Sequence, residues 1–177
     1  KEAGVPGGGG LPPLPGPPGS DALGLEAQLD GRYIKSIRIE EGEFTANGPG
    51  QEIPLTFAAQ GMSNVKQFEF RLEIDPVGAL SFEGSSFAAN NPFVVATSTG
   101  MLLLEDGQWA FAGAIFGDSR KEGDDVLGTA ILKTRDGFDA QTQVSIRVSF
   151  FSMGPSFSDR DKYFAEDLNI GVVVNGE

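Results

Sequence analysis

The chain has 177 residues, of which 40% are hydrophobic, and a formal net charge of −12, so it is long enough for one folded domain. A surface this acidic repels phosphate backbones and argues against nucleic-acid binding. Because the chain contains no cysteine and no histidine, disulfides, thiolate zinc sites, thiol nucleophiles and histidine-based catalytic triads are excluded.

Residues 1–20 contain six prolines and seven glycines, and we expect them to be an extended Gly/Pro-rich arm. Three interpretations are open: a collagen-type triple helix, whose glycine period is broken at Pro13; a polyproline II strand docked on a partner surface; and a flexible linker. The polyproline II arm is our prediction, with another copy of the chain as its expected partner. The expected contact residues are Val5, Leu11, Pro12, Pro13, Leu14, Pro15, Pro17 and Pro18.

Residues 21–32 are predicted to be a short helix or a linker. Ser20 is a suitable N-cap, and leucines and alanines follow it up to residue 29. Gly24 lies inside this stretch and weakens the helical pattern, and Gly31 marks its end.

From residue 33 onward the sequence becomes a succession of predicted strands. In residues 67–75 apolar and polar side chains alternate without a break, which is typical of an antiparallel strand with one buried face. Pro76 and Gly78 end this strand. Further strands are predicted over residues 33–40, 51–58, 79–83, 93–97, 101–105, 109–115, 126–134, 143–151 and 168–174.

The pattern as a whole predicts an all-β domain over residues 33–177. About nine strands are separated by frequent turn signals, such as Asp106-Gly107, and no long amphipathic helix interrupts them. An antiparallel β-sandwich of the jelly-roll type follows from this. No apolar run approaches the roughly 20 residues of a membrane span, so no membrane span is predicted.

Four segments carry a further signal: residues 51–57 (Gln-Glu-Ile-Pro-Leu-Thr-Phe), 65–76 (Val-Lys-Gln-Phe-Glu-Phe-Arg-Leu-Glu-Ile-Asp-Pro), 123–133 and 168–174. They resemble cohesin-like domains: the first two are similar to the family's opening strand pair, the third to its Gly-x-Leu-x-x-Leu-x-Phe strand and the fourth to its final strand. The resemblance covers about residues 33–176. It implies a nine-stranded jelly-roll sandwich, a fold shared with several carbohydrate-binding modules. Cohesins bind a dockerin on one sheet face, but no fixed motif marks the contacts, so the resemblance assigns no binding residue.

The loop predicted over residues 117–125 is rich in carboxylates. Calcium takes six to eight oxygen ligands, which acidic loops between strands can supply. The spacing matches no EF-hand, and neighbouring Arg120 and Lys121 can neutralise the charges, so a solvated turn is the favoured interpretation and a calcium site the alternative. Residues 158–167 carry a second acidic group with the same alternatives. The candidate calcium ligands, all in the loop of residues 117–125, are Asp118, Glu122, Asp124 and Asp125.

No residue pattern indicates an enzyme or a further cofactor. With 25 acidic residues, a pair of carboxylates at glycosidase spacing arises by chance and carries no signal. A sugar platform would have to use Trp109, Tyr33 or Tyr163, the aromatics with a polar group. Trp109 alternates in phase with Phe111 and is therefore predicted to lie in the core.

These observations predict a secreted, non-catalytic structural subunit. It would assemble into an extracellular filament or surface layer through its arm and its sandwich edges, with other copies of itself as partners. The alternative is a binding module, either of the cohesin type for a dockerin or for a polysaccharide. Both interpretations place the protein outside the cell or at its surface.

Overall fold

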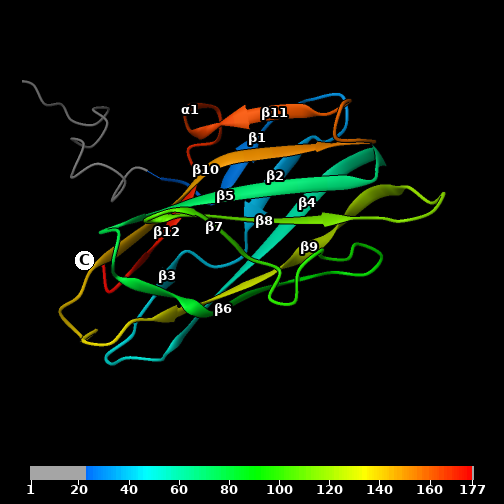
Figure 1. The fold of residues 1–177 in the computed structure, drawn as a ribbon. Helices are drawn as coiled ribbons and strands as arrows, with labels where there is room; N and C mark the ends of the chain where they lie inside the picture. The colour runs from blue at the N-terminus through cyan, green and yellow to red at the C-terminus, as the bar shows by residue number, and fades with distance from the viewer. Residues whose placement is uncertain (1–22, 177) are drawn as a thin grey trace, which may run out of the picture.

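The structure, a computed structural model, describes residues 23–176, so the predicted arm and its contact residues lie outside the described residues. The chain from residue 23 folds into two packed β-sheets (Figure 1). The elements in chain order are β1 (Glu26–Gln28), β2 (Ser36–Ile39), β3 (Glu43–Phe44), β4 (Glu52–Val65), β5 (Gln67–Asp75), β6 (Leu80–Ala89), β7 (Leu102–Glu105), β8 (Gln108–Ala114), β9 (Lys121–Thr134), β10 (Val144–Gly154), β11 (Asp161–Phe164), α1 (Ala165–Leu168) and β12 (Gly171–Val174).

The sheet topology confirms the predicted antiparallel sandwich. One sheet has five strands in the order β1-β2-β4-β9-β6, and the other has seven, in the order β3-β12-β10-β5-β8-β7 with β11 also on β10. Among these pairings, β12 with β3 is parallel and the others are antiparallel. β5 pairs with β10 along one edge, while β12 and β11 pair with successive parts of β10.

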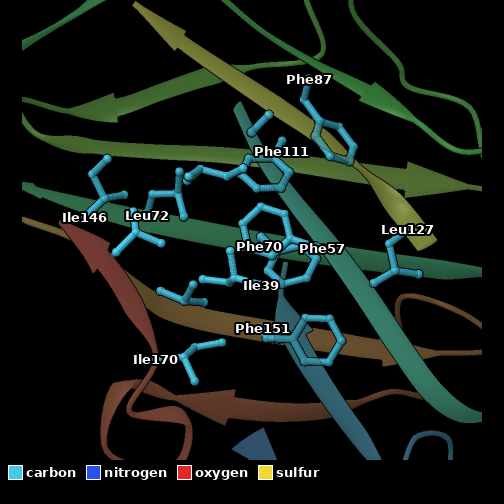
Figure 2. Packing of buried hydrophobic residues seen from close by; sticks show 14 of the residues in the cluster. Ile39, Phe57, Phe70, Leu72, Phe87, Phe111, Leu127, Ile146, Phe151 and Ile170 are labelled. Carbon is cyan, nitrogen blue, oxygen red and sulfur yellow. The ribbon is translucent and has the colours of Figure 1, made fainter. Parts of the chain in front are cut away.

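A phenylalanine cluster fills the space between the two sheets. The apolar side chains of β5 are almost completely buried, as its period-two pattern predicts. The Phe70 ring has its centroid 4.5 Å from that of Phe57 on the opposite sheet, 5.3 Å from Phe111 and 4.7 Å from Phe151 (Figure 2). The single tryptophan, Trp109, belongs to the same core, as predicted.

The helix predicted within residues 21–32 is not formed in its described part, where β1 pairs antiparallel with β2. Ala27 faces Ile37 in this register and is buried. A helix this short is marginal in water, and the open edge of β2 offers backbone hydrogen bonds that a strand can satisfy. Residues 26–28 therefore belong to the sandwich.

Two further predicted strands differ from the structure. Residues 93–97 contribute only an isolated bridge between Val94 and Ala114, because the surrounding turns interrupt pairing. The strand predicted over residues 168–174 is shortened to β12, since the chain first makes α1 and then turns at Asn169, which has a φ of 54°. Within residues 23–176, no helix is long and apolar enough to cross a membrane.

Candidate functional site

The candidate site is the outer face of the seven-stranded sheet, meaning the side of β10, β5, β8 and β7 that points away from the core. Because side chains alternate along a strand, the polar positions of β5 define this face. The strand register places one line of side chains across it: Leu102, Ala110, Arg71, Phe150 and Phe164. An apolar line with a single arginine at its centre suits contact with another macromolecule.

Strand β8 gives this face a flat floor. Its outward positions are occupied by Ala110, Ala112 and Ala114, which pair with Arg71, Glu69 and Gln67 of β5. Alanine side chains project little, so a partner can approach the sheet closely at Ala112 and Ala114, whereas Ala110 is buried.

Arg160 organises the centre of the outer face from the loop after β10. Its Nη1 donates to Oε1 of Glu69 at 3.1 Å and to Oγ of Ser152 at 2.7 Å. Arg71 pairs with the second oxygen of Glu69 at 2.8 Å, and its guanidinium lies 4.5 Å from the centre of the Phe150 ring. The side chain of Arg160 is only 6% exposed, so this network is nearly dry and orders the surface around it.

An apolar hollow of about 410 Å³ opens at the end of the outer face where β5 begins. Phe116 and Phe157 form its rim and are 77% and 72% exposed. Arg160 stacks on Phe157, with its guanidinium carbon 4.0 Å from the ring centre, and the Lys66 ammonium donates to the carbonyl of Gly117. The hollow is further lined by Val94, Ala112, Ala114 and Gln67. The Phe157 ring is thus held in place while it is exposed to solvent, and the bond from Lys66 anchors the backbone next to Phe116.

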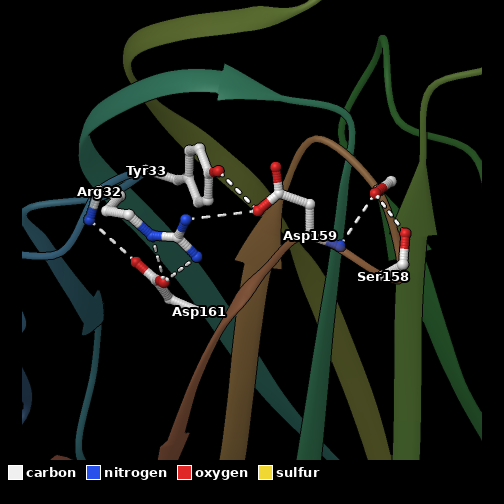
Figure 3. A network of polar contacts seen from close by, with 6 residues as sticks. Arg32, Tyr33, Ser158, Asp159 and Asp161 are labelled. Atoms are coloured by element: carbon white, nitrogen blue, oxygen red, sulfur yellow. Dashed lines mark hydrogen bonds and ion pairs between the residues drawn. The ribbon is translucent and has the colours of Figure 1, made fainter.

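The loop of residues 155–160, which we call the Phe157 loop, is held on its other side by polar contacts of Arg32 and Tyr33 with Asp159 and Asp161. We call these contacts the clamp (Figure 3). Arg32 donates from its backbone N–H and its Nε to the two oxygens of Asp161, each at 2.9 Å, and Tyr33 donates from its hydroxyl to Asp159 at 2.8 Å. The bond to Asp159 raises the pKa of Tyr33 above its ordinary value. The clamp joins the segment before β2 to Asp159 in the loop after β10 and to Asp161 at the start of β11.

Tyr163 packs behind this clamp with its ring stacked on Phe151, and burial raises its pKa from 10.0 to about 12. The unfolded chain ionises this tyrosine at a lower pH than the folded chain does. The contribution of Tyr163 to the free energy of unfolding is therefore complete below pH 10 and is lost as the pH rises from 10 to about 12.

We expect Tyr163→Phe to weaken this loss of stability at alkaline pH, measured by urea unfolding at pH 9.5 and pH 11.5. Ionisation of Tyr163 near pH 10, followed by absorbance at 295 nm, would contradict the prediction.

The four candidate calcium ligands are not brought together. Glu122 accepts from the backbone N–H of Asn64 at 2.9 Å, Asp124 accepts from that of Gly61 at 2.8 Å, and Asp125 pairs with Lys121 at 2.6 Å. The pairing with Lys121 lowers the pKa of Asp125. Asp118 lies in the turn before β9.

The acidic stretch continues β9 rather than forming a loop, and its carboxylates bond backbone donors where the β4–β9 register shifts. In the second acidic segment, Asp159 and Asp161 belong to the clamp and Asp167 accepts from the N–H of Phe164. Across the described part of the chain, no group of three or more acidic residues is placed to hold a metal ion.

The exposed aromatics of the site were not predicted from the sequence. Phe116 and Phe157 follow or precede glycine, proline and serine rather than standing inside an alternating strand. A large apolar residue in such a turn segment has no core to enter, and this signal could have identified both. The three aromatics considered for a sugar platform do not form one, because Trp109 is buried, as predicted, Tyr33 belongs to the clamp and Tyr163 stacks on Phe151.

Comparisons with known proteins agree with this architecture. No family model and no curated protein sequence matches the chain. Among solved structures, a cohesin module from a family 33 glycoside hydrolase of Clostridium perfringens superposes with a TM-score of 0.53, at 15% identity over 80% of this chain and 96% of that one. The third cohesin of ScaC from Acetivibrio cellulolyticus, solved in complex with the ScaB dockerin, gives 0.52 at 13% identity, over 78% and 96%. The chain thus has the jelly-roll sandwich fold that cohesin modules have, as predicted.

Proposed function

We propose that this chain, which has the cohesin-type fold, is a non-catalytic module that binds a partner protein on its outer face. One observation carries the proposal: Phe116 and Phe157 stand more than 70% exposed at the rim of an apolar hollow. Exposed apolar patches of this kind mark interaction sites, and aromatic residues supply much of the energy of protein–protein binding.

A dockerin-like protein is the partner class that we propose. The Acetivibrio neighbour was solved in complex with a dockerin, and the flat alanine floor of β8 suits a protein surface better than a sugar chain. Polysaccharide binding has less support, because Trp109 is buried. The proposal includes the extracellular location that the sequence predicts.

The test measures binding to a defined set of dockerins. Immobilised protein is titrated with purified dockerin modules, including the ScaB dockerin of Acetivibrio cellulolyticus, by surface plasmon resonance. We expect at least one to bind, and we expect the double variant Phe116→Ser, Phe157→Ser to weaken binding more than about 100-fold, since each hot-spot aromatic contributes about 2 kcal/mol or more.

A matched control replaces Leu25, which is also exposed but precedes β1 of the other sheet and lines neither hollow. Leu25→Ser should change the Kd less than about twofold. Equal binding by the double variant would overturn the assignment of the face. Failure of every dockerin to bind would overturn the dockerin-like partner.

One specific observation favours self-association of this chain. The edge strand β7 leaves Leu102, Leu103 and Leu104 each about half-exposed, and an apolar edge strand is a template for pairing with another chain. The structural-subunit alternative therefore proposes assembly through β7, in addition to the arm outside the described residues. Sedimentation equilibrium of the wild type beside Leu102→Lys, Leu104→Lys tests it, and a strictly monomeric wild type at high concentration would rule it out.

A further inference from the structure

A second hollow lies at the opposite end of the outer face and has a different chemistry. It has a volume of about 250 Å³, and we call it the polar hollow. The end of β5, Val77 in the turn that follows it, the turn between β7 and β8, the start of β8 and the start of β10 form its walls. Its polar lining residues are Glu73, Asp75, Asp106, Gln108, Ser145 and Arg147.

Two groups in its wall lack partners. Ser145 is 6% exposed, and its Oγ makes no hydrogen bond to any described residue. The Nε of Arg147, two residues along the same strand, is also buried and unpaired. Buried polar groups in native proteins are normally hydrogen-bonded, and leaving one unpaired costs about 1–3 kcal/mol. The Ser145 hydroxyl and the Arg147 Nε–H are therefore available to hydrogen-bond a bound polar ligand.

The charge of the polar hollow selects a cation. Three carboxylates, from Glu73, Asp75 and Asp106, face one guanidinium, that of Arg147. Within residues 23–176, none of these four side chains forms an ion pair or a side-chain hydrogen bond. The carboxylates are not arranged to hold a metal ion, since the described residues contain no such group. An ammonium or guanidinium on a flexible stem can satisfy carboxylates that are spread over two turns.

We propose that the polar hollow binds a lysine or arginine side chain of the partner protein. The cation pairs with Asp75 and Asp106, and a main-chain carbonyl of the partner accepts from Ser145 Oγ and Arg147 Nε. This inference rests on the proposed function for the identity of its occupant as a protein. It adds a specificity-determining site that lies apart from the apolar hollow.

The two hollows together orient the partner. Gln67 lines the apolar hollow and Glu73 the polar hollow, and six residues of extended strand separate them by about 20 Å. A partner must therefore present an apolar side chain and a basic one about 20 Å apart on one surface. Binding in the reverse direction would place the apolar group against carboxylates, which disfavours it.

The test uses N-acetyl-lysine methylamide as a probe with the folded protein, followed by two-dimensional 1H–15N NMR. We expect saturable shifts confined to the amides of Gly107, Gln108, Ser145 and Arg147, which weaken as salt is added. N-acetyl-norleucine methylamide has a similar stem without the charge and should give no saturable shift. The double variant Asp75→Asn, Asp106→Asn retains the turn-forming character of both positions and should weaken lysine binding at least fivefold.

Three outcomes would overturn the inference: no shift with the lysine probe, equal shifts with norleucine, or unchanged lysine binding by the folded double variant. The amide spectrum of the double variant reports whether it is folded. Failure of this inference is distinguishable from failure of the proposed function. If a dockerin binds the wild type, loses binding with Phe116→Ser, Phe157→Ser, and binds Asp75→Asn, Asp106→Asn normally, only the polar hollow is rejected.

Discussion

Replacing Phe70 with alanine is expected to lower the free energy of unfolding by about 4 kcal/mol. Phe70 is completely buried and its ring packs against Phe57, Phe111 and Phe151, so its removal leaves a cavity that the two sheets cannot close. A loss of this size is a large fraction of the 5–15 kcal/mol that stabilises a typical domain. Urea unfolding followed by the fluorescence of Trp109, the only tryptophan, measures it.

The matched control is Phe164→Ala, which removes the same group from a half-exposed position on β11. We expect a loss below about 1 kcal/mol there. Comparable losses for the two variants would contradict a core organised around the phenylalanine cluster.

Replacing Glu69 with leucine is expected to cost about 3 kcal/mol, because it leaves the buried guanidinium of Arg160 without its carboxylate. Leucine has a similar size, so the loss reports the missing charge more than missing volume. Because the pair is shielded from solvent, we also expect 0.5 M salt to change this loss little. Urea unfolding at two salt concentrations measures both effects.

Glu73→Leu is the control for this prediction. Glu73 lies on the same face of the same strand, is exposed and makes no ion pair with any described residue. Its replacement should change stability by less than about 0.5 kcal/mol. If Glu69→Leu were equally mild, the central network would be a weak surface ion pair and would not order the Phe157 loop.

The stability of the central network matters for the proposed function. Arg160 touches both Glu69 on the sheet and Phe157 on the loop, and the clamp of Arg32 with Asp161 holds the same loop from behind. A loop fixed from two sides presents Phe157 with little conformational freedom left to lose. Binding by a preorganised aromatic is tighter for that reason.

The sequence by itself determined the fold class. Uninterrupted alternation in residues 67–75 requires one buried face, and β5 occupies this stretch with its apolar side chains in the core. In residues 143–151 the pattern predicts Val144, Ile146, Val148 and Phe150 on one face. This is wrong for Phe150, because a register shift after Val148 pairs Phe150 with Arg71 and places Phe151 in the core instead. The same alternation correctly predicts that Trp109 is buried. Period-two patterning is a local property, so it can be read without knowing what packs on the strand.

Only the tertiary structure decided the candidate sites. The apolar hollow combines Phe116, which follows β8, with Phe157, which follows β10, and the polar hollow combines the end of β5 with the start of β10. Likewise, the acidic stretch before Val126 became part of β9 because bulges in β4 left backbone N–H groups for its carboxylates to bond. Sites of this kind depend on which strands become neighbours and in which register, and the strand pattern of a single sequence leaves both undetermined.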